Sequence, residues 1–325
     1  MIELTFREAI TAALDEELER DPTVFLLGED IGAFGGAMAC TRGLYKKHGA
    51  GRVIDMPISE SAIVGCALGA ALTGLRPVAE IMFIDFTGVC MDQIANHVAK
   101  TTYMLGGQVC VPLVIRTQGG AGKSYAAQHS QSLEPWFAYI PGLKVVTPAT
   151  PADAKGLLKS AIRENCPVMF VEHKLLYNTK GPVPEGEHLV PIGTPDVKRT
   201  GRDVTITAHS YMVLRALEAA EEASRSDGIE AEVIDLRTIS PLDMETVYDS
   251  VRKTGHLVSV EECHRSFGIG AEVVARVQEA CFEYLDGPAR RVGAADCPVP
   301  FSHVLERKAI PQLEDIMAAV HQTLE

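Results

Sequence analysis

Short runs of aliphatic and β-branched residues alternate with longer amphipathic stretches through the first half of the chain. The pattern predicts strands at Val53–Asp55, Pro77–Ile81, Val111–Thr117, Leu143–Thr147 and Val168–His173. It predicts helices between them at Ser59–Leu72, Phe86–Leu105 and Thr150–Glu164. The last helix has a clear start, with Thr150 at the cap and Pro151 in the first turn. Such alternation predicts a parallel α/β sheet with helices on both faces.

The periodicity is interrupted between residues 181 and 202, where Pro and Gly are frequent, and this composition is typical of a linker. Alternation then resumes. The predicted strands are Asp203–Ala208, Glu230–Leu236 and His256–Glu261, and the predicted helices are Val213–Ser226, Pro241–Thr254, Ala271–Leu285 and Ile316–Leu324. We therefore expect two α/β domains, at 1–180 and 203–325, joined by a linker at 181–202.

Composition narrows the possible functions. Hydrophobic residues make up 46% of the 325 residues and charged residues 22%, which excludes a disordered chain or a bare coiled coil. The 43 acidic against 30 basic residues give a net charge of −13 and argue against a nucleic-acid or anionic-membrane partner. The longest nearly apolar run, Ala62–Leu72, is too short to cross a bilayer, and the N-terminus lacks the pattern of a signal peptide.

The eight cysteines form no C-x-x-C pair and no zinc-binding pattern. Most stand in apolar surroundings, such as Cys66 and Cys90, so we expect reduced, buried thiols. Free thiols of this kind are typical of a reducing compartment, and we expect a cytoplasmic protein.

Three glycine-containing motifs resemble known sites. Residues 117–124 (TQGGAGKS) resemble a phosphate-binding loop, but Thr117 replaces its first glycine. Residues 268–273 (GIGAEV) resemble a dinucleotide fingerprint, but Val273 replaces the third glycine. We expect the first to be a flexible loop and neither to bind a nucleotide. Gly65 and Gly69 lie on one face of a predicted helix and favour close packing against another helix or subunit.

Three polar or aromatic segments are candidates for a site. Glu60 begins a helix at the carboxyl edge of the predicted sheet, where α/β proteins bind ligands, or it simply complements the helix dipole. Phe83 and Phe86 line a pocket or belong to the core. His129 follows the glycine-rich loop within a polar segment, and is either catalytic or solvated. The residue pattern alone leaves these alternatives open.

Eight segments carry a resemblance over essentially the whole chain. They are Leu27–Gly32, Pro57–Ser61, Gly74–Ile81, Asp92–Asn96, Ala127–Ser132, Pro141–Pro148, Asp153–Arg163 and Ile234–Asp243. In them the chain resembles the beta subunit of the thiamine-diphosphate-dependent first component (E1) of 2-oxo acid dehydrogenase complexes, in the pyruvate and acetoin branch. The resemblance implies a pyrimidine-binding, transketolase-like domain followed by a transketolase C-terminal-like domain.

The resemblance also implies roles for individual residues. The family's glutamate at the position of Glu60 binds a pyrimidine ring nitrogen and favours the imino tautomer, whose exocyclic nitrogen takes the proton from the thiazolium carbon. Phe86 matches the aromatic residue that stacks on the pyrimidine ring, and Met82 and Ile63 are expected to line the same pocket. His129 matches the family's catalytic histidine, which acts near the substrate and the incoming lipoyl group.

The resemblance further predicts cofactors and partners. The family holds magnesium and the diphosphate through a Gly-Asp-Gly segment, which this chain lacks, so an alpha subunit is expected to supply it in a tetramer of two alpha and two beta chains. A dihydrolipoyl acyltransferase is the expected acyl acceptor. A potassium ion is expected on backbone oxygens near Ala161 and Ile162.

The predicted function is therefore that of an E1 beta subunit acting on pyruvate or acetoin. The segment Glu172–Glu185 resembles this branch more than the branched-chain branch. A branched-chain 2-oxo acid enzyme, a non-catalytic scaffold that docks the acyltransferase, and a nucleotide-binding protein are the alternatives.

Overall fold

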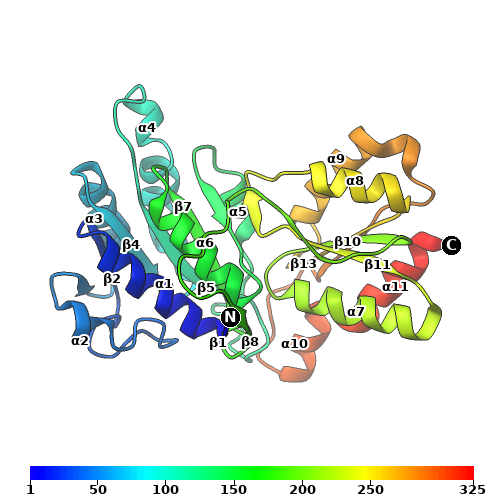
Figure 1. The fold of residues 1–325 in the computed structure, drawn as a ribbon, viewed down its shortest axis with the longest axis horizontal. Coiled ribbons are helices and arrows are strands. Elements are labelled where there is room, and N and C mark those ends of the chain that lie inside the picture. Colours follow the sequence, from blue (N-terminus) through cyan, green and yellow to red (C-terminus); the bar gives the residue numbers. More distant parts are fainter. The chain divides into compact units, whose positions relative to one another are not determined.

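The computed structural model describes all 325 residues, and the chain divides into two compact units (Figure 1). The first unit comprises Met1–Gly119 and Trp136–Ile192, and the second comprises Gly120–Pro135 and Gly193–Glu325. Each unit is built on a sheet of mainly parallel strands covered by helices, which confirms the predicted fold class.

The sheet of the first unit contains parallel strands in the order β6-β7-β5-β4-β2-β3. Their bounds are β2 Val24–Gly28, β3 Val53–Asp55, β4 Arg76–Ile81, β5 Val114–Gly119, β6 Lys144–Val146 and β7 Val168–His173. Every residue of the two strands β5 and β7 is buried, as expected for strands covered on both faces. A separate antiparallel pair joins β1 (Ile2–Thr5) to β8 (Lys180–Val183).

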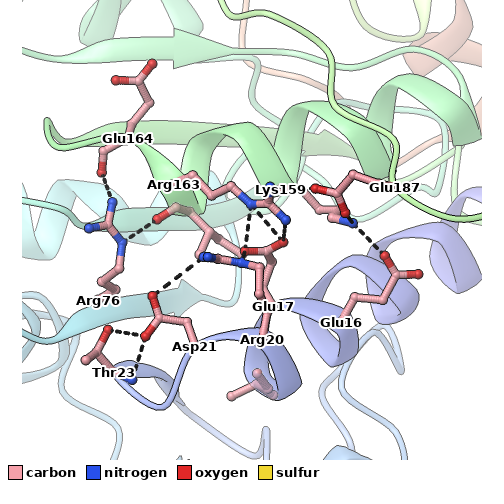
Figure 2. Close-up of polar contacts among 12 residues, drawn as sticks. Glu16, Glu17, Arg20, Asp21, Thr23, Arg76, Lys159, Arg163, Glu164 and Glu187 are labelled. Carbon is pink, nitrogen blue, oxygen red and sulfur yellow. Dashed lines mark hydrogen bonds and ion pairs between the residues drawn. The ribbon is translucent and has the colours of Figure 1, made fainter.

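Helices α1 (Phe6–Arg20) and α6 (Pro151–Arg163) lie side by side on this unit (Figure 1). The Thr150 hydroxyl accepts the backbone N–H of Asp153 at 3.1 Å, which confirms the predicted start of α6. A network of ion pairs joins the two helices around the buried Glu17 carboxylate (Figure 2). This unit also holds α2 (Leu44–His48) and α3 (Glu60–Leu72), and α5 (Glu134–Ala138) begins in the segment that clusters with the second unit.

The single helix predicted at Phe86–Leu105 is wrong. A 3-10 helix η1 (Ile84–Cys90), a π-helix η2 (Gln93–Val98) and a short α4 (Thr101–Met104) stand in its place. Hydroxyl groups compete for the helical carbonyls here, because Thr87 Oγ1 donates to Ile84 O at 2.5 Å and Thr101 Oγ1 to His97 O at 2.6 Å. Short 3-10 and π segments of this kind often accompany functional sites.

The second unit holds a five-stranded sheet in the order β14-β13-β10-β11-β9, in which only β9 is antiparallel to its neighbour. The strand bounds are β9 Asp196–Arg199, β10 Val204–Ala208, β11 Ala231–Asp235, β13 Leu257–His264 and β14 Arg290–Ala294; β12 is Thr238–Ser240. Helix α7 (Met212–Asp227) packs with α11 (Leu313–Leu324), and α8 (Glu245–Thr254) with α9 (Ile269–Cys281). The short elements η3 (Phe282–Tyr284) and α10 (His303–Ala309) complete it, and none of the chain's helices is long and apolar enough to cross a membrane.

The expected limits 1–180, 181–202 and 203–325 differ from these units in two respects. The segment 120–135 clusters with the second unit, because carboxylates of that unit bind its backbone. The expected linker contains part of β8 and all of β9, short edge strands that tolerate Pro182 and the polar composition.

The helix predicted from Pro241 begins only at Glu245, whose N–H donates to the Asp243 carboxylate at 3.1 Å.

Candidate functional site

Two strands of the first unit lead at their carboxyl ends to predicted cofactor residues, and the strand between them is followed by an acidic residue. Glu60 is the first residue of α3, shortly after β3, and Met82 directly follows β4. Strand β2 lies between β3 and β4 in the sheet and ends at Gly28. Glu29 therefore follows β2 at the same edge of the sheet. Ligands of α/β proteins bind at this edge of a parallel sheet.

Glu60 lies in an acidic and partly dehydrated environment. Burial, then the charges of Asp30 and Glu60, raise the pKa of the Glu29 carboxyl. Burial and the charge of Glu60 raise the pKa of the Cys90 thiol to about 12. Glu29 and Cys90 therefore both lie near Glu60, and each of these two groups retains its proton more readily than it would in water.

Glu29 lies near Glu60 at this edge, and no role was predicted for it from the sequence. It stands in the segment Leu27–Gly32 that carries the resemblance. The signal that would have found it is an acidic residue directly after a buried parallel strand, adjacent to the strand that leads to Glu60.

The apolar members of the predicted site lie on elements that contact one another. Ile63 is buried in α3, one turn after Glu60, and Phe86 lies half-buried in η1. Helix α3 packs against η1, and Ser61 Oγ donates to Val89 O at 2.9 Å. The Phe86 ring stands edge-to-face with Phe83, with centroids 5.7 Å apart. Glu60 and Ile63 on α3 and Phe86 on η1 therefore lie on two elements that pack against each other.

The position of Met82 is fixed through its backbone. Its carbonyl accepts a hydrogen bond from Gln118 Nε2 at 2.9 Å, which ties the end of β4 to the end of β5. The neighbouring Phe83 ring is covered by the Lys174 ammonium, 5.4 Å from the ring centroid, and Lys174 directly follows β7. Residues from the ends of three strands thus hold the segment that leads to Phe86.

His129 belongs to the second unit, in a loop that leaves β5 after Gly119. The backbone N–H of Gly120 donates to Gln131 O at 2.9 Å and closes the base of this loop. The His129 side chain is half-buried, and the backbone N–H of His129 donates to Ala126 O at 3.4 Å. His129 thus lies on the loop that was predicted to carry it. The hydrogen bond between Gly120 and Gln131 brings the two ends of this loop together.

The first-unit residues fit the pyrimidine end of thiamine diphosphate. A pyrimidine ring needs a partner for a ring nitrogen, an aromatic face and apolar walls, which Glu60, Phe86 and Ile63 offer on the contacting elements α3 and η1. No group of three or more His, Cys, Asp or Glu side chains in the chain has the arrangement of a metal site.

The backbone carbonyls of Ala161 and Ile162, the two residues predicted to hold potassium, each accept a hydrogen bond. The Ala161 carbonyl accepts the N–H of Glu164 at 3.2 Å, and the Ile162 carbonyl accepts Arg76 Nε at 2.9 Å. Both oxygens already have donors, and one of these is a cationic guanidinium (Figure 2 shows Arg76 beside Glu164). Each carbonyl oxygen has a second lone pair, so the potassium ion stays a prediction.

Comparisons with known proteins place this geometry in a family. Residues 2–180 match the transketolase pyrimidine-binding domain, and residues 193–316 match the transketolase C-terminal domain. The structure is similar to a split-gene transketolase described as an inactive beta4 tetramer, with a TM-score of 0.81, 26% identity and coverage of 99% of this chain and 98% of that one.

Two curated relatives are similar over nearly the whole chain. The beta subunit of acetoin:2,6-dichlorophenolindophenol oxidoreductase from Cupriavidus necator is 50% identical, covering 99% of this chain and 98% of the relative. The mitochondrial pyruvate dehydrogenase E1 component subunit beta from Bos taurus is 49% identical, covering 99% and 91%. The chain therefore belongs to the family of E1 beta subunits of pyruvate and acetoin dehydrogenases, with a transketolase-type pyrimidine-binding domain followed by a transketolase-type C-terminal domain.

Proposed function

We propose that this chain is the beta half of a thiamine-diphosphate-dependent enzyme that cleaves pyruvate or acetoin and passes the acetyl group to a lipoyl carrier. The observation that carries the proposal is the position of Glu60 at the start of α3, at the carboxyl edge of the sheet, with Phe86 on the contacting element η1. Relatives named for both substrates share half of the sequence.

In this proposal the first unit binds and orients the pyrimidine. The Glu60 carboxyl holds a ring nitrogen, Phe86 stacks on the ring face, and Ile63 and Met82 form the apolar wall. Burial, then the charges of Asp30 and Glu60, raise the pKa of Glu29, so Glu29 is placed to hold a proton next to Glu60. When bound, thiamine diphosphate supplies the carbon nucleophile that attacks the substrate carbonyl.

His129 acts at the later stage, the transfer of the acyl group to the lipoyl dithiolane. An imidazole changes its protonation state near neutral pH, so it can deliver a proton or stabilise developing charge there. The acceptor in the proposal is the lipoyl group of a dihydrolipoyl acyltransferase. The resemblance, together with the half-buried loop position of His129, supports this role.

An alpha subunit completes the site, holding the diphosphate and magnesium. The face of α3 that carries Gly65 and Gly69 supports a partner surface, because a side-chain atom added at either glycine would meet nothing within 4 Å in this chain. Cys66 and Leu72 on the same helix are exposed. The beta chain of the structurally similar split transketolase is described as an inactive tetramer, which agrees with a site that needs a second chain.

The test is reconstitution with the alpha subunit. The chain alone should show no turnover, and the mixed tetramer should be active. Glu60→Gln should abolish most of that activity while circular dichroism stays unchanged. Glu221→Gln serves as the matched control because Glu221 is exposed on α7. Full activity without the alpha chain, or unchanged turnover in Glu60→Gln, contradicts the proposal.

The substrate is tested in the same tetramer. Pyruvate, acetoin and a branched-chain 2-oxo acid are compared at equal concentrations by dye reduction. Pyruvate or acetoin should give the highest kcat/KM, because both deliver the same two-carbon acyl unit. A preference for the branched-chain acid would move this chain to the other branch of the family.

A further inference from the structure

We propose that Glu306 is a positioning residue for His129: its buried carboxylate holds the backbone of the loop on which His129 is carried. The inference rests on the proposed role of His129 in acyl transfer. Glu306 lies in α10, is fully buried and is 184 residues away in sequence from Gly122, the loop residue that it binds.

The contacts run from the carboxylate to the loop backbone. Glu306 Oε1 accepts the N–H of Gly122 at 2.8 Å, and Oε2 accepts the N–H of Ser124 at 3.0 Å. The Ser124 hydroxyl lies 3.3 Å from the same Oε2. His303 Nδ1 stands 4.0 Å from Oε2. Hydrogen bonds to an ionised carboxylate are among the strong ones, so the loop is held firmly at this point.

The loop has the shape of an anion cradle. Positive φ angles occur at alternate residues, at Gly120 (88°), Gly122 (93°), Ser124 (55°) and Ala126 (62°). Alternation of this kind is typical of an anion-binding nest. The N–H groups of Gly122 and Ser124 both face Glu306, whereas that of Ala121 faces Glu262. The sequence of this loop resembles a phosphate-binding loop, and here a carboxylate of the same chain takes the place of the phosphate.

A second carboxylate fixes the base of the same loop. One oxygen of Glu262, on β13, accepts the N–H of Ala121 at 2.7 Å and the hydroxyl of Ser132 at 3.1 Å. His129 therefore lies on an arc whose two ends are joined by Glu262 and whose glycine-rich side is held by Glu306. We infer that these two acids set the direction in which the imidazole is presented.

Glu306→Gln tests this at nearly constant size. The amide NH₂ group of glutamine would face a backbone N–H where a carboxylate oxygen now accepts one, so the loop should loosen. In the reconstituted tetramer, acetylation of a lipoyl domain should slow by about ten- to hundredfold, as small misplacements of catalytic groups do. Reduction of 2,6-dichlorophenolindophenol, which bypasses the lipoyl group, should stay within about twofold of wild type because Glu60 and Phe86 are untouched. Glu314→Gln, at an exposed position of α11, is the matched control.

A double-mutant cycle separates positioning from general destabilisation. If Glu306 acts through His129, then His129→Ala combined with Glu306→Gln should be no slower in lipoyl acetylation than His129→Ala alone. Losses that multiply would overturn the inference. If His129→Ala itself leaves lipoyl acetylation unchanged, the proposed role of His129 fails first and the inference fails with it.

Hydrogen exchange supplies a readout that does not depend on turnover. The amides of Gly122 and Ser124 should exchange faster in Glu306→Gln than in wild type, and unchanged exchange would overturn the inference. Gly122→Ala approaches the same contact from the loop side, because an alanine is strained at a φ of 93° and the buried carboxylate stays in place. The same selective loss of lipoyl acetylation is expected, and wild-type kinetics in this variant would also overturn the inference.

Discussion

The Glu17 carboxylate on α1 accepts a hydrogen bond from Arg163 Nη2 on α6 at 2.6 Å (Figure 2). The same carboxylate accepts a hydrogen bond from Arg20 Nε at 2.7 Å. Glu17 is fully buried, so one buried carboxylate binds two guanidinium groups. Glu17→Ala should lower the free energy of unfolding by about 2 kcal/mol, because it removes a buried acceptor of charged hydrogen bonds, whereas Arg163 keeps Glu187 as a partner and Arg20 is partly exposed to water. Urea denaturation followed by circular dichroism measures this.

The same network contains its own control. Glu187 pairs with Lys159 and Arg163 but is 58% exposed, and hydrogen bonds from these two residues lower its pKa to about 2. Glu187→Ala should cost less than about 1 kcal/mol, because water screens exposed pairs. If Glu17→Ala and Glu187→Ala lowered the free energy of unfolding equally, burial would not explain the contribution of the Glu17 ion pairs to stability.

Glu261 should make stability depend on pH. Its carboxylate on β13 accepts the N–H groups of Ile269 at 2.7 Å and Gly270 at 2.9 Å, at the start of α9. Burial outweighs these bonds and raises its pKa from 4.5 to about 7. The folded state therefore binds more protons than the unfolded state between these values, so the free energy of unfolding falls as pH rises through this window.

The fall attributable to Glu261 is about 3 kcal/mol at most. Glu261→Gln should flatten the dependence between about pH 4.5 and pH 7, as measured by urea denaturation at several pH values. A slope identical to that of wild type would assign the pH dependence to other groups.

Several strands were predictable from the sequence, although none was predicted at β2 (Val24–Gly28) or β14 (Arg290–Ala294). Val53–Asp55 and Val168–His173 are short runs of β-branched or apolar residues and were predicted at their observed bounds. No helix was predicted at α1, although Thr5 and Glu8 form a capping box that marks its start. The irregular η1–η2 segment escaped prediction because side-chain hydroxyls compete for carbonyls in ways that periodicity does not encode.

Site residues could be predicted only where neighbouring residues in the sequence indicate their position. Glu60 was indicated by its place between a strand and a helix, and its role by resemblance. The contact of Glu306 with Gly122 could not be predicted, because no short sequence pattern links residues that are 184 positions apart. The two apparent nucleotide motifs share one explanation: Gly122 binds Glu306, and Gly268 and Gly270 approach Glu261, where an added Cβ at Gly270 would lie 2.8 Å from its carboxylate.

The thiols should divide into two classes under native conditions. The prediction of buried thiols is only partly correct: Cys40, Cys90, Cys263 and Cys281 are buried and Cys166 is half-buried, whereas Cys66, Cys110 and Cys297 are exposed. Burial raises the pKa of the Cys90 thiol to about 12, so it stays protonated and unreactive. Brief alkylation at neutral pH should modify the three exposed residues first, as peptide mass spectrometry would show. Early modification of Cys90 would contradict its burial beside Glu60.

Gly65→Ala should separate the stability of the isolated chain from its assembly. The added methyl group meets nothing within 4 Å, and alanine favours a helix over glycine by about 0.5–1 kcal/mol, so the isolated chain should melt at a higher temperature. The same methyl group should hinder the approach of the alpha subunit and weaken the tetramer in sedimentation experiments. Gly51→Ala is the matched control, because it adds a methyl group in open space on an exposed turn and should leave assembly unchanged. A Gly65→Ala chain that is more stable yet assembles like wild type would remove this face of α3 from the alpha–beta interface.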